Sequence, residues 1–106
     1  MNKGTMTIEN AIVTNNSGYK KTNPSGSMVG SSLICNEGTD ATESAAAKIA
    51  VLNIKGSTFT QYNFIAVKNS SNAELNISGG VINSKQSAVQ NWCNANITGG
   101  ELNGQL

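Results

Sequence analysis

Apolar and polar residues alternate along much of the chain. Residues 52–54, 65–69 and 75–77 place apolar side chains at every second position, and Gly, Asn and Ser stand between these segments. A period of two is typical of half-buried β-strands, whereas an amphipathic helix needs a period near 3.6. Residues 42–50 (TESAAAKIA) are the exception, because their alanines and the Glu43/Lys48 pair fit one or two helical turns as well as an ordinary linker.

The alternating segments belong to a longer repeat. Four isoleucines are each followed, five positions later, by another apolar residue. These anchors are Ile8, Ile54, Ile77 and Ile97, and the residues that follow them are Val13, Phe59, Ile82 and Leu102. Successive anchors are 46, 23 and 20 residues apart. We interpret the 46-residue step as one repeat with two enlarged loops, residues 14–32 and 37–50, since no other such anchor lies inside it.

This repeat predicts an all-β fold: a parallel β-helix (β-solenoid) of about three to four coils of 20–23 residues, with three short strands in each coil and long loops in the first. A single coil cannot bury its own apolar face, but coils stacked ~4.8 Å apart bury a continuous core. Glycines at 56, 79–80 and 99–100 fall at the bend between the first two strands, where positive φ is expected. Residues 1–106 are expected to form one such domain or a fragment of a longer one.

Asparagines recur at matched positions of the repeat. Asn36, Asn69 and Asn91 each close the third strand, where stacked side-chain amides can hydrogen-bond along the axis. The alternative is that Asn is simply common in turns, but the matched register favours a structural Asn ladder. A second row, Asn53, Asn76 and Asn96, is expected to point outward as a solvated face.

The unit LNISGGVINSKQSAVQN resembles the I-x-G-G-x-I … A-I/V-x-N repeats of right-handed parallel β-helix proteins of the pectin lyase-like superfamily. Variants of this kind occur in surface proteins of gut Firmicutes and in proteins of their phages. The resemblance covers residues 52–106 well and residues 7–36 loosely. It implies a right-handed helix and a structural or adhesive module of a phage virion (fibre or capsid-associated) or of a bacterial surface protein. The superfamily also includes enzymes that cut acidic polysaccharides, so a carbohydrate-binding or degenerate polysaccharide-active module is the alternative.

Composition argues against catalysis. The chain has no His and no Arg, Asp40 is its only Asp, and its five glutamates are scattered over the repeats. A glycosidase needs two carboxylates flanking one bond, and Glu37 with Asp40, which share a loop, are better explained as a solvated pair. We therefore expect no catalytic, cofactor or metal site. Charged residues make up only 12% of the chain and the net charge is +1, which disfavours nucleic acid as a partner.

Three aromatic residues are the candidate contact residues. Trp92 follows Asn91 and is expected to point outward if Asn91 points inward, while Tyr62 and Phe64 lie in the preceding repeat. Exposed aromatic rings bind sugars or anchor subunit interfaces. Packing within the core of their own loop is the alternative.

The cysteines and the strand edges bear on partners. Cys35 and Cys93 are expected two coils apart in the same sector, too far for a disulfide, as small buried or half-buried thiols. An interchain disulfide is the minor alternative. Open strand edges predict a homo-oligomer, for example a trimer, or further coils. The chain shows no signal peptide and no run of ~20 apolar residues, so we expect no membrane insertion. The resemblance implies a location on a virion, at the bacterial cell surface or outside the cell.

Overall fold

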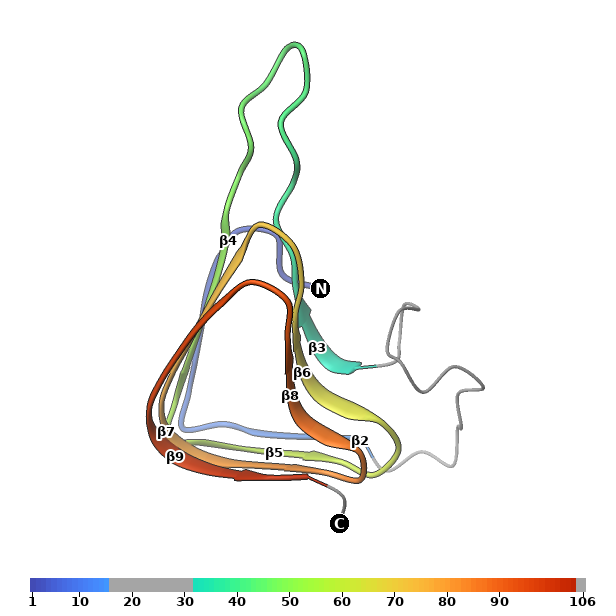
Figure 1. Cartoon of the computed structure of the whole chain (residues 1–106). Coiled ribbons are helices and arrows are strands. Elements are labelled where there is room, and N and C mark those ends of the chain that lie inside the picture. Colours follow the sequence, from blue (N-terminus) through green and yellow to red (C-terminus); the bar gives the residue numbers. More distant parts are fainter. Residues whose placement is uncertain (16–31, 105–106) are drawn as a thin grey trace.

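The computed structural model describes residues 1–15 and 32–104 (Figure 1). These residues form nine β-strands and no helix. The strands are β1 (Thr5–Glu9), β2 (Ile12–Asn15), β3 (Ser32–Asn36), β4 (Ala50–Lys55), β5 (Ser57–Gln61), β6 (Ile65–Asn69), β7 (Ala73–Ser84), β8 (Ser87–Asn91) and β9 (Asn94–Asn103). The predicted all-β class is therefore confirmed.

The strands form two parallel sheets. The larger sheet has six strands in the order β1-β4-β7-β5-β2, with β9 also paired to β7, and it is strongly curled (Figure 1). The smaller sheet has the order β3-β6-β8. Every pair of named strands runs parallel, as the sequence predicts. In Figure 1 the two sheets outline a triangle, whose interior holds the core.

The register of the sheets confirms the repeat. Ile54 lies opposite Ile8 on one side and Ile77 on the other, and Ile77 lies opposite Ile97. Phe59 lies between Val13 and Ile82 in the same way. Because Ile8 and Ile54 are direct neighbours, the 46-residue step is a single repeat with enlarged loops, as interpreted from the sequence.

The bends between strands differ from the prediction of three short strands in each coil. β7 and β9 contain 12 and 10 residues and continue through the bend without interruption. Gly80 and Gly100 take φ values of 100° and 96° there, and the pairing of β7 with β9 shifts register nearby. A glycine can adopt this backbone without steric penalty, so the strand turns a corner while its pairing is preserved on both sides.

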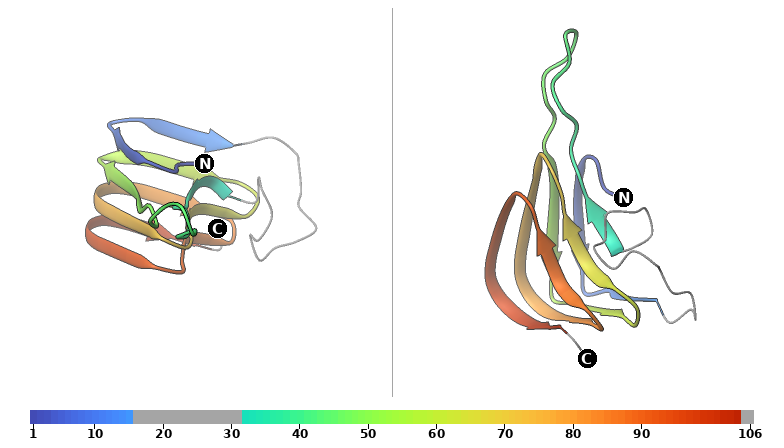
Figure 2. Two further views of the ribbon diagram at one scale, coloured as in Figure 1. Left: turned by 90° about the horizontal axis from the view of Figure 1, so that it is seen from above. Right: turned by 45° about the vertical axis from the view of Figure 1, so that its right-hand side comes forward.

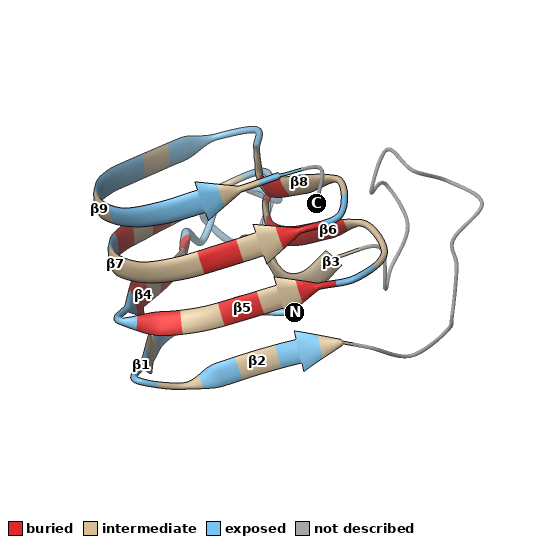
Figure 3. Ribbon diagram, turned by 90° about the horizontal axis from the view of Figure 1, so that it is seen from below, coloured by how far each residue is buried: buried red, intermediate tan, exposed pale blue. Residues whose placement is uncertain are grey.

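The core is deepest in the middle of the molecule. Its fully buried apolar members come from β4, β5, β6 and β7, and Figure 3 shows these strands as the most buried. The largest of them are Leu52, Ile54, Phe59, Ile65, Val67, Leu75, Ile77 and Ile82. Each such side chain contributes up to about 1.5–3 kcal/mol when it is removed from water. The equivalent residues of β9 are more accessible to solvent: Ile97 is 47% and Leu102 39% exposed.

Residues 37–49 form an arm that projects away from the sheets (Figures 1 and 2). Thr39 and Lys48 pair in an antiparallel bridge, with both backbone N–H···O distances at 2.9 Å. The chain turns between these two residues, and there the carbonyl of Ala45 accepts a hydrogen bond from the N–H of Thr42. Of the two alternatives for residues 42–50, the helical one is therefore wrong. Most of the other enlarged loop, residues 16–31, lies outside the described residues.

Replacing Gly80 by Ala is expected to lower the free energy of unfolding by at least about 2 kcal/mol. A Cβ on Gly80 would lie 2.1 Å from the carbonyl oxygen of Ser57, and the backbone has positive φ. The matched control is Gly79→Ala in the same bend, where the nearest atom to a Cβ lies 3.6 Å away. Urea denaturation measures both variants. Equal losses would contradict the geometry of this bend.

Candidate functional site

A row of asparagine side chains lies at the C-terminal ends of the strands of the small sheet. We call it the amide ladder, and its members are Asn2, Asn36, Asn69 and Asn91. The Nδ2 of Asn2 donates to Oδ1 of Asn36 at 2.8 Å. Asn36 donates to Asn69 at 2.9 Å, and Asn69 donates to Asn91 at 2.8 Å. The three predicted members are thus stacked and bonded, which confirms the predicted Asn ladder over the simple turn alternative.

The amide ladder also connects the two sheets through hydrogen bonds to the backbone of the large sheet. The Nδ2 of Asn36 donates to the carbonyl oxygen of Glu74 at 2.9 Å, and that of Asn69 donates to the carbonyl of Asn94 at 2.9 Å. Asn36 and Asn69 are fully buried. Buried amides without partners are costly, and here each amide satisfies the next. The corner that follows β3 and the corner that follows β6 are therefore each held by an amide of the ladder.

Sequence reasoning missed Asn2 as a member of this row. Asn2 lies three positions before Thr5, and Asn91 lies three positions before Asn94. Thr5 and Asn94 belong to the same row of the large sheet, since they align with Val51 and with its neighbour Glu74 respectively. This equal spacing of three residues is the feature of the sequence that could have placed Asn2 in the amide ladder.

The outward row of asparagines is also bonded. Asn96 donates to Asn76 at 3.0 Å, and Asn76 donates to Asn53 at 2.9 Å. Asn53 donates to the hydroxyl of Thr7 at 3.3 Å. This outer Asn row lies on the solvent side of the large sheet, so the face expected to be plainly solvated is an ordered polar stripe.

The candidate aromatic residues lie at two separate corners. Trp92 is 70% exposed in the turn between β8 and β9, so it points outward as expected. Tyr62 is 53% exposed and Phe64 is half-buried, and both lie between β5 and β6. In Figure 1 these two turns stand at opposite ends of the small sheet. The structure therefore does not bring the three rings onto one surface.

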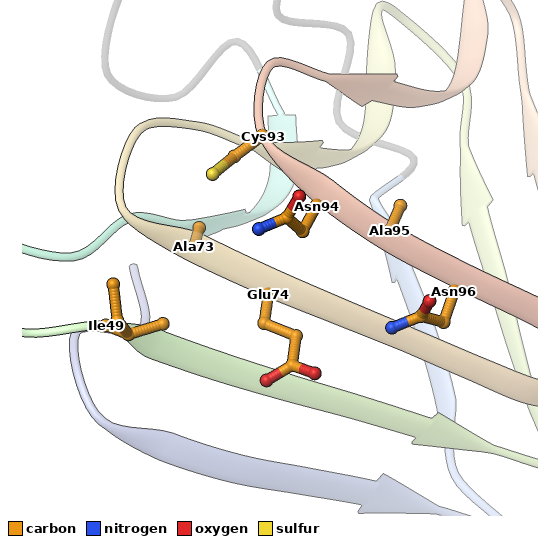
Figure 4. Close-up of a pocket in the computed structure, with 7 residues that line it drawn as sticks. All are labelled: Ile49, Ala73, Glu74, Cys93, Asn94, Ala95 and Asn96. Carbon is orange, nitrogen blue, oxygen red and sulfur yellow. The ribbon is translucent and has the colours of Figure 1, made fainter.

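A hollow of about 420 Å³ lies on the outside of the large sheet, at the base of the arm (Figure 4). We call it the corner hollow, and its lining residues are Ile49, Ala73, Glu74, Cys93, Asn94, Ala95 and Asn96. It combines one carboxylate, two amides and a thiol with the apolar side chain of Ile49. The sequence did not predict it, because Ile49 and Cys93 come from distant segments that only the pairing of β4, β7 and β9 brings together.

The carboxylates of the predicted loop pair have separate partners. Glu37 forms an ion pair with Lys3 at 3.5 Å and accepts a hydrogen bond from Ser70 Oγ at 3.1 Å. Asp40 accepts a hydrogen bond from the side-chain amide of Asn72. Within residues 1–15 and 32–104, no group of three His, Cys, Asp or Glu residues is placed to hold a metal ion. The same residues contain no helix long and apolar enough to cross a membrane.

The cysteines differ from the prediction in two respects. Cys35 aligns with Lys68, which aligns with Gln90, so Cys93 does not share its row. Cys93 is exposed, not half-buried, because it follows the third strand and lies in the turn beyond Asn91. Both cysteines are free, as expected. Burial raises the pKa of the Cys35 thiol above its usual value, and the charge of Glu37 raises that pKa further.

No model of a known protein family matches this chain, and no significant match is found among curated proteins or solved structures.

Replacing Asn69 by Ala is expected to lower the free energy of unfolding by about 2–4 kcal/mol, because it leaves buried partners of the amide ladder unbonded. Asn96→Ala is the control, since it removes an exposed amide of the outer Asn row and should cost less than about 1 kcal/mol. Chemical denaturation followed by far-ultraviolet circular dichroism measures both. Similar losses in the two variants would contradict the structural role of the ladder.

The two thiols are expected to react at different rates with a disulfide reagent at neutral pH. Cys93 reacts quickly because it is exposed, while Cys35 reacts slowly because its raised pKa keeps it protonated. The slow rate should increase as pH rises past the usual pKa of a thiol. Glu37→Gln removes a charge that raises the pKa and should therefore speed the slow phase. A single fast phase from both thiols in the folded protein would contradict the placement of Cys35.

Proposed function

We propose that the two parallel sheets are successive faces of a right-handed β-solenoid. The support is the register: residues 20 to 46 positions apart lie side by side in every strand pair. The amide ladder crosses from one repeat to the next at the same corner. A solenoid explains both observations, since each coil then contacts only its neighbours.

The proposed role is a non-enzymatic structural or adhesive module of a phage virion, in its fibre or capsid-associated, or of a bacterial surface protein. The single observation that carries this proposal is the use of the buried polar side chains. In the amide ladder they bond to one another and to the backbone of the next strand, and so serve to stack the chain. A rigid stack of this kind suits a rod or a spacer. The proposed partners are further copies in a homo-oligomer, such as a trimer, or further coils.

Carbohydrate binding is the second candidate function, and the corner hollow favours it. Glu74, Asn94 and Asn96 offer a carboxylate and two amides, which suit sugar hydroxyls. Trp92 precedes Cys93 of this hollow in the same turn and is largely exposed. Aromatic rings commonly provide the apolar contact surface for a sugar. In this second reading the ligand would be a cell-surface glycan.

The structural role is tested by locating the protein. Gold-labelled antibodies raised against the purified chain should mark the outside of bacterial cells or phage particles in cultures that express it. Electron microscopy of intact and of permeabilised cells makes the comparison. Label confined to the interior of permeabilised cells, with none on cells or particles, would contradict a surface or virion module.

The carbohydrate reading is tested by Trp92→Ala. If Trp92 provides a stacking surface, its loss should weaken retention on immobilised cell-wall polysaccharide by about tenfold. Tyr62→Ala is the matched control, because it removes another exposed ring from a different corner and should leave retention unchanged. Unchanged retention of the Trp92 variant, or no retention of the unaltered protein, would remove this candidate.

A further inference from the structure

The two ends of the stacked strands are open among the described residues. At one end β9 pairs only with β7, and at the other end β1 and β2 pair only with β4 and β5. At both ends, residues that continue the rows of the buried core are partly exposed to solvent. Ile97 and Leu102 are 47% and 39% exposed, whereas Ile77 and Ile82 of the neighbouring strand are about 1% exposed. Unpaired strand edges with apolar rows readily accept another strand.

The two free strand edges are complementary, because each is equivalent to an edge that is already paired within the chain. The free edge of β9 is equivalent to the edge by which β7 receives β9. The free edge of β1 is likewise equivalent to the edge by which β4 pairs with β1 and to the edge by which β7 pairs with β4. Placing a second β1 against β9 therefore repeats a contact that the chain already makes three times in one row, from Ile8 through Ile54 and Ile77 to Ile97.

The polarity of the amides distinguishes the possible arrangements of two copies. In the amide ladder Asn2, Asn36 and Asn69 each donate toward the β9 end, so Asn91 presents its Nδ2 at that end and Asn2 its Oδ1 at the other. Asn91 Nδ2 also donates to the carbonyl of Cys93, and Asn2 Oδ1 also accepts from the N–H of Gly4, but each group has a second hydrogen-bonding position. In the outer Asn row the direction is reversed, so Asn96 presents its Oδ1 at the β9 end and Thr7 its hydroxyl at the other. Head-to-tail contact joins donor to acceptor in both rows. Head-to-head contact would oppose donor to donor and acceptor to acceptor.

We propose that the β9 end of the stack is a docking surface for a second copy of this chain, which pairs its β1 and β2 in parallel with β9 and sets its Asn2 against Asn91. This inference rests on the proposed solenoid. In such a contact the second copy's Ile8 continues the row of Ile97, and its Val13 continues the row of Leu102. The position between β8 and the second copy's β3 has no strand among the described residues. A heterologous contact of this kind does not close, so copies would add in an open series.

Cysteine crosslinking tests the contact. In a Cys35→Ser, Cys93→Ser background, Thr7→Cys and Asn96→Cys are made in separate proteins and then mixed with oxidised glutathione, which accepts the thiol electrons. In-register parallel neighbours lie ~4.8 Å apart, within the range that a disulfide spans. The mixture should give a crosslinked heterodimer, and each protein alone should remain uncrosslinked. A homodimer of the Asn96→Cys protein, or no heterodimer, would overturn the head-to-tail contact.

An intrachain control separates this inference from the solenoid on which it rests. Asn53→Cys with Asn76→Cys, in the same background, should form a disulfide within one chain, because these residues are direct neighbours. If this bond forms and the heterodimer does not, only the docking inference fails. If neither forms although circular dichroism shows a folded β protein, the stacked arrangement itself fails.

A second measurement does not depend on the cysteine background. Leu102→Lys places a charge at the open apolar row of β9, while Tyr62→Lys places one at an exposed corner away from both ends. In sedimentation velocity at rising concentration, the unaltered chain and Tyr62→Lys should form a series of growing species. Leu102→Lys should remain a monomer with an unchanged circular dichroism spectrum. A concentration-independent monomer for the unaltered chain would overturn the proposal.

Discussion

The structure depends on one constraint: equivalent residues of successive repeats must lie directly beside one another. Parallel pairing aligns Ile54 with Ile77 and at the same time aligns Asn36 with Asn69. The amides can be buried only because of this alignment, since each one finds its hydrogen-bond partner in the identical residue of the next repeat. A shift of one residue would expose the apolar rows and leave the amides unbonded. Apolar and polar rows therefore specify the same register.

The same constraint explains where the molecule is open. Strands in the middle of the sheets have neighbours on both sides and are buried, while the apolar residues of β9, at one edge, are exposed (Figure 3). The proposed rod, the proposed docking of a second copy and the candidate sugar-binding corner all use surfaces created by stacking. The arm at residues 37–49 and the corner hollow lie beside the stack and do not interrupt its pairing (Figures 2 and 4).

Much of this could be predicted from the sequence, because parallel pairing of equivalent residues requires the same residue types at the same positions of each repeat. The spacing of the anchors gave the register, and the glycines marked the bends, where Gly80 and Gly100 have positive φ. Features that occur once were not predictable. The sequence marked residues 37–50 as an enlarged loop, but the antiparallel bridge of the arm and the corner hollow have no second copy in the repeat to compare. The exposure of Cys93 depends on where one turn ends. Asn2 was missed because no apolar strand precedes it to reveal its place in the row.

The most direct test of this account is the solvent exchange of the side-chain amides, measured by nuclear magnetic resonance on ¹⁵N-labelled protein. The account predicts that the Nδ2 protons of Asn36 and Asn69 exchange far more slowly than those of Asn96, and that they show a through-space contact with each other. Fast exchange at Asn36 and Asn69, comparable to that of Asn96, would contradict the buried amide ladder and with it the register on which the fold depends.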